Sequence, residues 1–176
     1  RKGVAEADIV LVTGGTSVGE TDLVPEAIRL LGKPSMLIHG VSMRPGMPTG
    51  LASVNGKAIV SLPGQPVAAM IAFKTFVRPI MLRLLGTEDE PVASVKAKVS
   101  RRVASAPGMK TFLRVTVTEV NGEYVADPIS ASGSGLLSSM TQANGIVVIP
   151  EDKEGIEAGE EVRVELFRPI ERGRHG

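Results

Sequence analysis

The chain has 176 residues, of which 43% are hydrophobic and 22% charged, which is the composition of an ordinary folded protein of one or two domains. Aromatic residues make up only 3%, so we expect an aliphatic core and exclude a nucleic-acid module built on stacked aromatic rings. A net charge of +1 argues against strong attraction to a polyanion. The sequence contains no cysteine, which excludes a disulfide framework, a thiolate metal site and a cysteine nucleophile.

The two histidines, His39 and His175, argue against a histidine-based zinc site and against a Ser-His-Asp triad. The sequence has no apolar run of bilayer length and does not open with a signal-peptide pattern. We therefore expect a cytoplasmic protein that binds neither membrane nor nucleic acid.

Charge is distributed unevenly along the chain. Residues 1–86 carry nine Lys/Arg and five Asp/Glu, whereas residues 87–176 carry 11 and 14. Between these halves lies a short acidic stretch that ends in Pro91, which is typical of a linker. We therefore predict four segments, which are a first domain (1–86), a linker (87–94), a second domain (95–170) and a tail (171–176).

The first half has the pattern of an α/β domain. Residues 1–6 resemble the end of a helix, and 8–13 form a continuous apolar run typical of a strand buried on both faces. A helix is predicted over 23–31 and a second strand over 35–41. Residues 51–62 predict a hairpin, because Asn55-Gly56 tolerates the positive φ angles of a type I′ turn.

A long helix is predicted over residues 66–85, with Pro79 expected to kink it or to mark its weakest turn. We expect the methionines to fill core space. The second half instead contains short β-rich runs separated by turn residues, which favours a small sandwich or barrel. These runs are residues 95–105, 111–120, 124–129, 146–149 and 162–167.

The first segment that could carry chemistry is TGGTSVGETD, residues 13–22, between the first strand and a helix. Ligands bind at the carboxyl ends of parallel strands, and glycines let backbone N–H groups approach an anion. The segment is neither a Walker A motif nor G-x-G-x-x-G. It is equally typical of a tight turn in which Asp22 caps the helix.

Two further loops also follow strands. LPGQP, residues 62–66, leads into the start of the long helix, where free N–H groups could face an anion, although a rigid connector would look the same. SMRPGMP, residues 42–48, presents Arg44, which could clamp an oxyanion or simply be solvated. We expect the loop after the first strand and the proline-framed turn to meet on a single charged ligand.

These segments, in this order, resemble the MoeA/gephyrin family of molybdopterin molybdenumtransferases. The resemblance rests on ADIVLVTGGTSVGETD, SMRPGMP and SLPGQPVAA, followed by GMKTFLRV (108–115), SGSG (132–135), ANG (143–145) and AGE (158–160). It implies the C-terminal part of a MogA-like molybdopterin-binding α/β domain followed by a small all-β barrel. It also implies that an earlier part of the α/β domain and two further N-terminal domains lie outside this chain.

The function that the resemblance implies is insertion of molybdenum from molybdate into adenylylated molybdopterin, with Mg²⁺, during molybdenum cofactor biosynthesis. The nucleotide ester is hydrolysed as the metal enters the dithiolene, and a cation offsets the repulsion between two bound anions. A homodimer is expected by analogy alone.

Position by position, the resemblance assigns Asp22, Pro63 and Pro66 to the catalytic site, with Asp22 as the metal ligand. The residues that it assigns to cofactor binding are Gly14, Gly15, Ser17, Gly19, Arg44, Gly64, Arg114 and Ser134.

Two positions depart from the family pattern. Met47 stands where a second Lys is usual, and Ala68 where a Ser often follows the proline turn. Both changes remove donors that an oxyanion would use. They motivate an alternative function, which is a non-catalytic molybdopterin-binding or scaffold module.

Overall fold

The computed structural model describes residues 1–14, 23–32, 36–129 and 136–170. The chain divides into two compact units, Arg1–Asp89 and Glu90–Gly176. The division falls inside the stretch 87–94 that the sequence predicts as a linker. Each unit is described by itself below.

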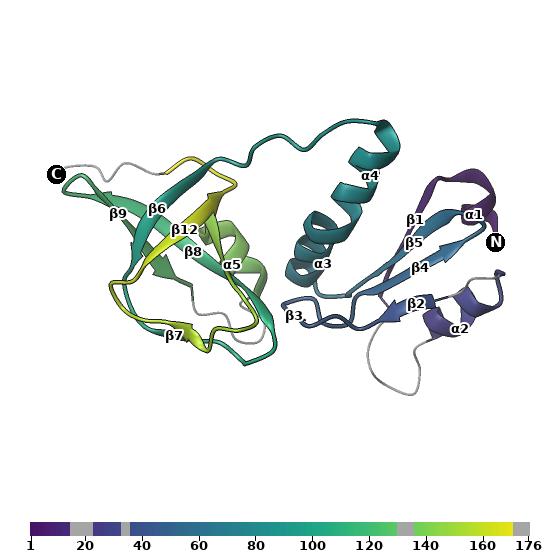
Figure 1. Cartoon of the computed structure of the whole chain (residues 1–176), viewed down its shortest axis with the longest axis horizontal. Coiled ribbons are helices and arrows are strands. Elements are labelled where there is room, and N and C mark those ends of the chain that lie inside the picture. The colour runs from purple at the N-terminus through teal and green to yellow at the C-terminus, as the bar shows by residue number, and fades with distance from the viewer. Residues whose placement is uncertain (15–22, 33–35, 130–135, 171–176) are drawn as a thin grey trace. The chain divides into compact units, whose positions relative to one another are not determined.

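The first unit is built on a four-stranded mixed sheet with the strand order β1-β5-β4-β2 (Figure 1). Its strands are β1 (Ile9–Thr13), β2 (Met36–His39), β4 (Gly50–Val54) and β5 (Lys57–Leu62). β1 pairs with β5 in parallel, and β4 is antiparallel to both β5 and β2. Consequently β1, β5 and β2 all point the same way and end at the same edge of the sheet.

The β4–β5 hairpin forms as predicted. Val54 pairs with Lys57, so Asn55 and Gly56 are the two loop residues, with φ angles of 53° and 77°. These positive angles are the ones that a type I′ turn requires, which is why Asn-Gly occupies the tip.

Two helices cover one face of this sheet. They are α1 (Lys2–Glu6) and α2 (Leu23–Arg29). Ile28 of α2 is buried with Ala52, Val54 and Ile59 of the sheet, and Val10 packs against this cluster. The core is aliphatic, as the composition predicts.

The predicted long helix is a continuous helical segment in three parts, α3 (Pro66–Ala72), a π-helical turn η1 (Phe73–Val77) and α4 (Arg78–Leu85). In the π turn the Arg78 N–H donates to the Phe73 carbonyl, five residues earlier. Pro79 follows at once, and its ring has no N–H and crowds the preceding turn. Widening that turn by one residue accommodates the proline, so the expected weak turn takes the form of a π segment.

The second unit is a closed five-stranded barrel. Its strands follow the order β10-β12-β6-β9-β8, and β8 pairs back with β10 to close the sheet. They are β6 (Ser94–Val99), β8 (Lys110–Val120), β9 (Glu123–Pro128), β10 (Gly145–Ile149) and β12 (Glu161–Leu166). Side chains of all five strands fill the interior, where Ala97, Val115, Ala126, Val147 and Val164 are buried together. Of the two architectures left open by the β-rich pattern, the barrel is correct.

The sequence prediction missed one helix in this unit. α5 (Leu136–Gln142) lies between the β-rich runs 124–129 and 146–149, where the sequence analysis predicts only turn residues. Two short strands, β7 (Val103–Ala104) and β11 (Gly155–Ile156), pair with each other outside the main barrel ladder.

The part of the chain that the structure describes contains no helix with both the length and the apolar character needed to cross a bilayer.

Candidate functional site

The loops singled out in the first domain leave the same edge of its sheet. β1 and β5 are parallel neighbours whose last residues, Thr13 and Leu62, pair with each other. β2 ends at this edge too, and the chain then passes through β3 (Met43–Arg44) before returning as β4 (Figure 1). The carboxyl edge of parallel strands is where α/β proteins hold their ligands.

Two predicted binding glycines lie next to each other at this edge. A Cβ placed on Gly64 would lie 3.7 Å from the Cα of Gly14. Gly14 has a φ of 79°, which side chains disfavour, and no atom of the described residues lies within 4 Å of the position that its Cβ would take. The first loop and the proline turn therefore begin next to each other, each with a glycine that has no side chain. An anion can reach backbone N–H groups in such a place.

The proline turn splits into a buried and an exposed part. Pro63 is buried, whereas Gly64, Gln65 and Pro66 are exposed. Pro66 occupies the first turn of α3, and Gln65 at the N-cap makes no side-chain hydrogen bond to the helix. Within the described part of the chain, no side chain caps the N–H groups of this first turn, so these groups can serve a ligand.

The loop that carries Arg44 is held rigidly by its own backbone. Gly40 N–H donates to the Thr49 carbonyl (3.0 Å) and Val41 N–H to the Met47 carbonyl (2.9 Å). The buried Thr49 hydroxyl donates to the Gly46 carbonyl (2.6 Å). The Arg44–Pro45 peptide is cis and the Arg44 side chain is exposed. The guanidinium is therefore presented at the sheet edge by a fixed turn.

Ser61 is a polar group at this edge that the sequence analysis missed. Its side chain is buried in β5, and its hydroxyl finds no hydrogen-bond partner among the described residues. Buried hydroxyls normally have a partner. The only sequence signal was a lone hydroxyl residue within the apolar strand KAIVSL.

In the barrel, Arg114 lies on β8 opposite Ile146 of β10. The residue is only 9% exposed, and its Nε has no hydrogen-bond partner in the described part of the chain. Burial lowers the pKa of its guanidinium. The carbonyl of Arg114 accepts from the Ile129 N–H (3.0 Å), so the stretch that leads to Ser134 begins beside this arginine.

The other described cations of the barrel all have partners. Lys96, Lys98, Arg102, Lys110 and Lys153 form ion pairs with Glu161, Glu123, Glu157, Glu151 and Glu160, respectively. Arg101 and Arg168 donate to backbone carbonyls, and Arg163 donates to the Ser94 hydroxyl. Arg114 is therefore the described barrel cation best suited to pair with an incoming anion.

The remaining predicted site residues, Gly15, Ser17, Gly19, Asp22 and Ser134, lie outside the described residues. Within the described ranges, no group of three or more His, Asp or Glu side chains comes together as a metal site.

Asn144, in the ANG stretch, is a structural residue. Its buried side chain accepts from the Val117 N–H (2.7 Å) and donates to the Val117 carbonyl (2.9 Å). The side chain thus forms with β8 the same pair of hydrogen bonds that the backbone of a neighbouring strand would form. The next residue must be small, since a Cβ on Gly145 would lie 2.4 Å from Val164 Cγ1.

Two family models match the chain, one in each unit. Residues 1–83 match the model of a probable molybdopterin binding domain, and residues 96–167 match that of the MoeA C-terminal region, domain IV.

The chain is similar to known proteins over nearly its whole length. It is 36% identical, over 94% of its length, to a Methanocaldococcus jannaschii protein assigned to molybdopterin biosynthesis, and 30% identical, over 96%, to the molybdopterin molybdenumtransferase of Bacillus subtilis. It spans 38% and 39% of those relatives. The structure also resembles a crystal structure of the MoeA protein from Pyrococcus horikosii, with a TM-score of 0.73 and 35% identity. The match covers 96% of this chain and 39% of the Pyrococcus chain.

The chain belongs to the MoeA family of molybdopterin biosynthesis proteins and corresponds to the C-terminal portion of its members.

Proposed function

We propose that the chain binds molybdopterin and takes part in inserting molybdenum from molybdate into the adenylylated form of that molecule. The observation that carries this proposal is the shared carboxyl edge, where Gly14, Gly64 and Arg44 are presented by loops that follow three co-directional strands. Family membership supplies the ligand class.

The edge suits a phosphorylated ligand. Backbone N–H groups beside Gly14 and at the uncapped start of α3 donate to phosphate oxygens without adding bulk. The exposed Arg44 guanidinium adds a charged donor. The buried Ser61 hydroxyl lies one residue from the end of β5 and offers one more polar group at the same place.

Arg114 is proposed to hold an oxyanion. Burial removes the water that would otherwise stabilise the charge of this guanidinium, and its Nε has no partner among the described residues. A bound anion would accept a hydrogen bond from Nε and balance the charge, so binding is strongly favoured. Molybdate is the oxyanion of the proposed reaction. Ser134 is proposed as a further contact on the basis of the family resemblance.

Mg²⁺ is proposed as the required cation, with Asp22 as its carboxylate ligand. A bound Mg²⁺ would offset charge repulsion between the two anionic substrates.

Calorimetric titration of the chain with molybdopterin tests the binding role. We expect saturable one-to-one binding that weakens at least tenfold in Arg44→Met, because one charged hydrogen-bond donor is lost. Arg29→Met, on the exposed surface of α2, is the matched control and should bind normally. Absence of binding by the unmodified chain would refute the proposal.

Turnover is tested separately in the full-length protein, since the chain spans only 38% and 39% of its relatives. The measurement is AMP release from adenylylated molybdopterin in the presence of molybdate and Mg²⁺. We expect Asp22→Asn to lose most of this release while it still binds molybdopterin. A full rate in Asp22→Asn would contradict the role assigned to Asp22.

A second function, a non-catalytic molybdopterin-binding or scaffold module, is favoured by Met47 and Ala68. Met47 is exposed and Ala68 is buried at the start of α3. Both side chains are apolar, so neither replaces the side-chain donor that the family pattern has at its position. Binding of molybdopterin without AMP release in the full-length protein would support this second function.

A further inference from the structure

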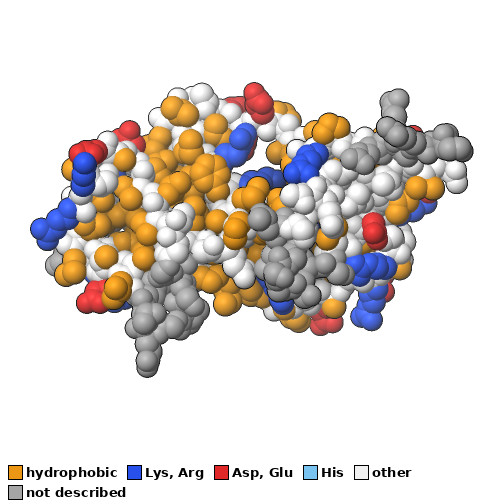
Figure 2. Space-filling view, turned by 180° about the vertical axis from the view of Figure 1, so that it is seen from behind, with side chains coloured by type: hydrophobic (Ala, Val, Ile, Leu, Met, Phe, Trp, Pro, Cys, Tyr) orange, Lys and Arg blue, Asp and Glu red, His pale blue; other side chains and the backbone are white. Residues whose placement is uncertain are grey.

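Ser61 is a polar group enclosed within the first unit, whereas several large apolar side chains of this unit reach its surface (Figure 2). Met70 and Met81 of the long helical segment are 52% and 40% exposed, so the expectation that methionines fill the core is wrong for these two. Ser61 is only 2% exposed, and its hydroxyl has no hydrogen-bond partner among the described residues. A buried hydroxyl of this kind calls for a partner, either within the fold or on a ligand.

The strand register places Ser61 where the three predicted ligand loops converge. Ser61 lies opposite Val12 of β1 on one side and opposite Gly50 of β4 on the other. The first loop begins directly after Val12, and the proline turn begins directly after Ser61. The loop that presents Arg44 ends two residues before Gly50. Each loop therefore begins or ends within two residues of the row that contains Ser61.

The register also fixes the face of the sheet on which the hydroxyl lies. Side chains alternate along a strand, so Ser61 shares a face with Ile59. Ile59 is buried with Ile28 of α2, and Val12, beside Ser61, packs against the same cluster. The hydroxyl thus lies on the α2 face, with apolar side chains beside it. In such surroundings a hydrogen bond is strong, and a missing one is costly.

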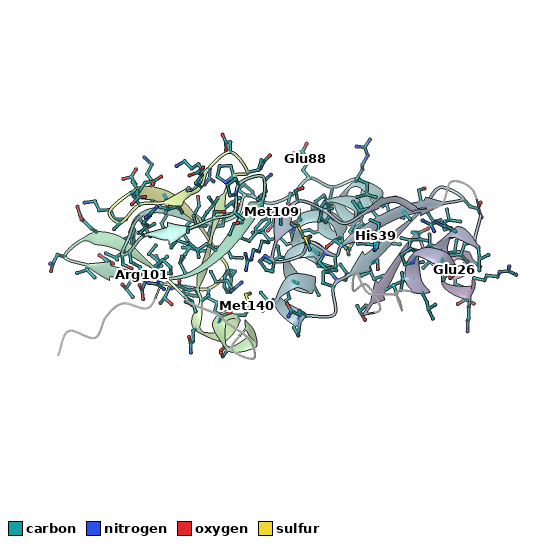
Figure 3. The ribbon with its side chains drawn as sticks, turned by 90° about the horizontal axis from the view of Figure 1, so that it is seen from below. Glu26, His39, Glu88, Arg101, Met109 and Met140 are labelled. Atoms are coloured by element: carbon teal, nitrogen blue, oxygen red, sulfur yellow. The ribbon has the colours of Figure 1, made fainter. Side chains whose placement is uncertain are left out.

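The same row of the sheet runs from an exposed residue to the buried serine. His39, the last residue of β2, pairs with Gly50 and is labelled in Figure 3. His39 is exposed, whereas Ser61 is buried. Gly50, between them, has no side chain, and a glycine inside a strand often marks a place where a ligand approaches the backbone. The row therefore has an open end and an enclosed end, and Ser61 lies at the enclosed end.

The two kinds of polar group at this edge suit different parts of one ligand. Arg44 and Gly64 are exposed, so a phosphate bound there keeps part of its water while it accepts from a guanidinium and from backbone N–H groups. Placing the phosphate beside Ser61 and Val12 would remove that water, and a hydroxyl brings no charge to replace it. A neutral ring with N–H donors and nitrogen acceptors suits Ser61, because a hydroxyl both donates and accepts.

We propose that the Ser61 hydroxyl binds the neutral pterin ring of molybdopterin and makes the site specific for that end of the ligand. The inference rests on the proposed function and adds an orientation to it. The ring lies toward the α2 face of the sheet, and the phosphate lies toward Arg44.

Competition between molybdopterin and inorganic phosphate, measured on the full-length protein, separates the two ends. Molybdopterin affinity comes from calorimetry, and phosphate affinity from its displacement of bound molybdopterin. We expect Ser61→Ala to weaken molybdopterin binding about tenfold, because a buried hydrogen bond is lost, and to leave phosphate affinity unchanged. Arg44→Met should weaken both. Ser53→Ala, a half-buried serine on the opposite face of β4, is the matched control and should change neither.

Thermal unfolding of the same variants tests whether the hydroxyl instead serves the fold. Removing a buried hydroxyl that has no partner in the fold should leave Ser61→Ala at least as stable as the unmodified protein. A clear loss of stability would show that the hydroxyl pairs within the fold and would overturn the proposal.

The binding results separate this inference from the function on which it rests. Unchanged molybdopterin affinity in Ser61→Ala, an equal loss of phosphate affinity, or phosphate that does not displace molybdopterin would each overturn the role of Ser61 while the proposed function stands. An unmodified protein that binds no molybdopterin would refute the proposed function itself, and the inference with it.

Discussion

At the residue scale, the described polar groups divide into those that hold the fold and those that have no partner within it. Asn144 is of the first kind, because both of its side-chain hydrogen bonds go to Val117. Arg114 and Ser61 are of the second kind, since each is buried with an atom that no described group satisfies. Groups of the second kind are the better candidates for ligand contacts.

Asn144→Ala should destabilise the barrel by roughly 2–4 kcal/mol, since it leaves the buried N–H and carbonyl of Val117 without partners. Urea unfolding measures the loss. Gln142→Ala, two residues earlier and exposed, should change stability by less than about 0.5 kcal/mol. Equal stability of the two variants would contradict the role of Asn144.

Arg114→Met should move stability and binding in opposite directions. Removing a buried, unpaired charge is expected to leave the free energy of unfolding unchanged or to raise it by up to about 2 kcal/mol. Molybdate affinity should fall at least tenfold, and Arg102→Met, an exposed control paired with Glu157, should retain it. A large loss of stability in Arg114→Met would assign the arginine a structural role instead.

Glu160 gives the turn before β12 a pH dependence. Its carboxylate accepts from Lys153 Nζ and from the Glu157 N–H, and these two interactions lower its pKa. A lowered folded-state pKa stabilises the fold above the ordinary glutamate pKa, and this contribution is lost as the pH falls through the folded value. Glu160→Gln should therefore lower Tm slightly at pH 7, and the difference should vanish in acid. A difference that persists at low pH would exclude the carboxylate as its cause.

At the element scale, local chemistry made much of the fold predictable. The Asn55-Gly56 turn, the apolar run of β1 and the long helix each follow from side-chain pattern and backbone preference over neighbouring residues. α5 was missed because Ser and Gly dominate the sequence around its start, and the barrel strand that it contacts, β8, lies far away in sequence. The hydrogen bonds of Asn144 reach 27 residues back along the chain, a distance that no local pattern records.

Gly56, at the hairpin tip, allows the effect of backbone conformation on stability to be measured without an effect of packing. Gly56→Ala should destabilise the first unit by about 1 kcal/mol, because its φ is 77° although its Cβ would meet nothing. Gly3→Ala, the same substitution within α1, should be neutral or stabilising by up to about 1 kcal/mol. Thermal unfolding compares the two, and similar effects would contradict this explanation.

At the scale of the whole molecule, the predicted ligand loops depend on topology more than on any one motif. Their meeting follows from strand direction, since β1, β5 and β2 end at one edge although they are far apart in sequence. Each of the three loops could be recognised in the sequence, and their order along the chain matches the family that the sequence resembles. The contact between Gly14 and Gly64 required the pairing of β1 with β5.

The central claim is that these loops bind one ligand, and amide NMR during a titration of the chain with molybdopterin tests it most directly. We expect the N–H signals of Gly14, Arg44 and Gly64 to shift together and to saturate with a single dissociation constant. Signals that saturate at different concentrations, or that stay still while binding is detected elsewhere, would contradict the claim.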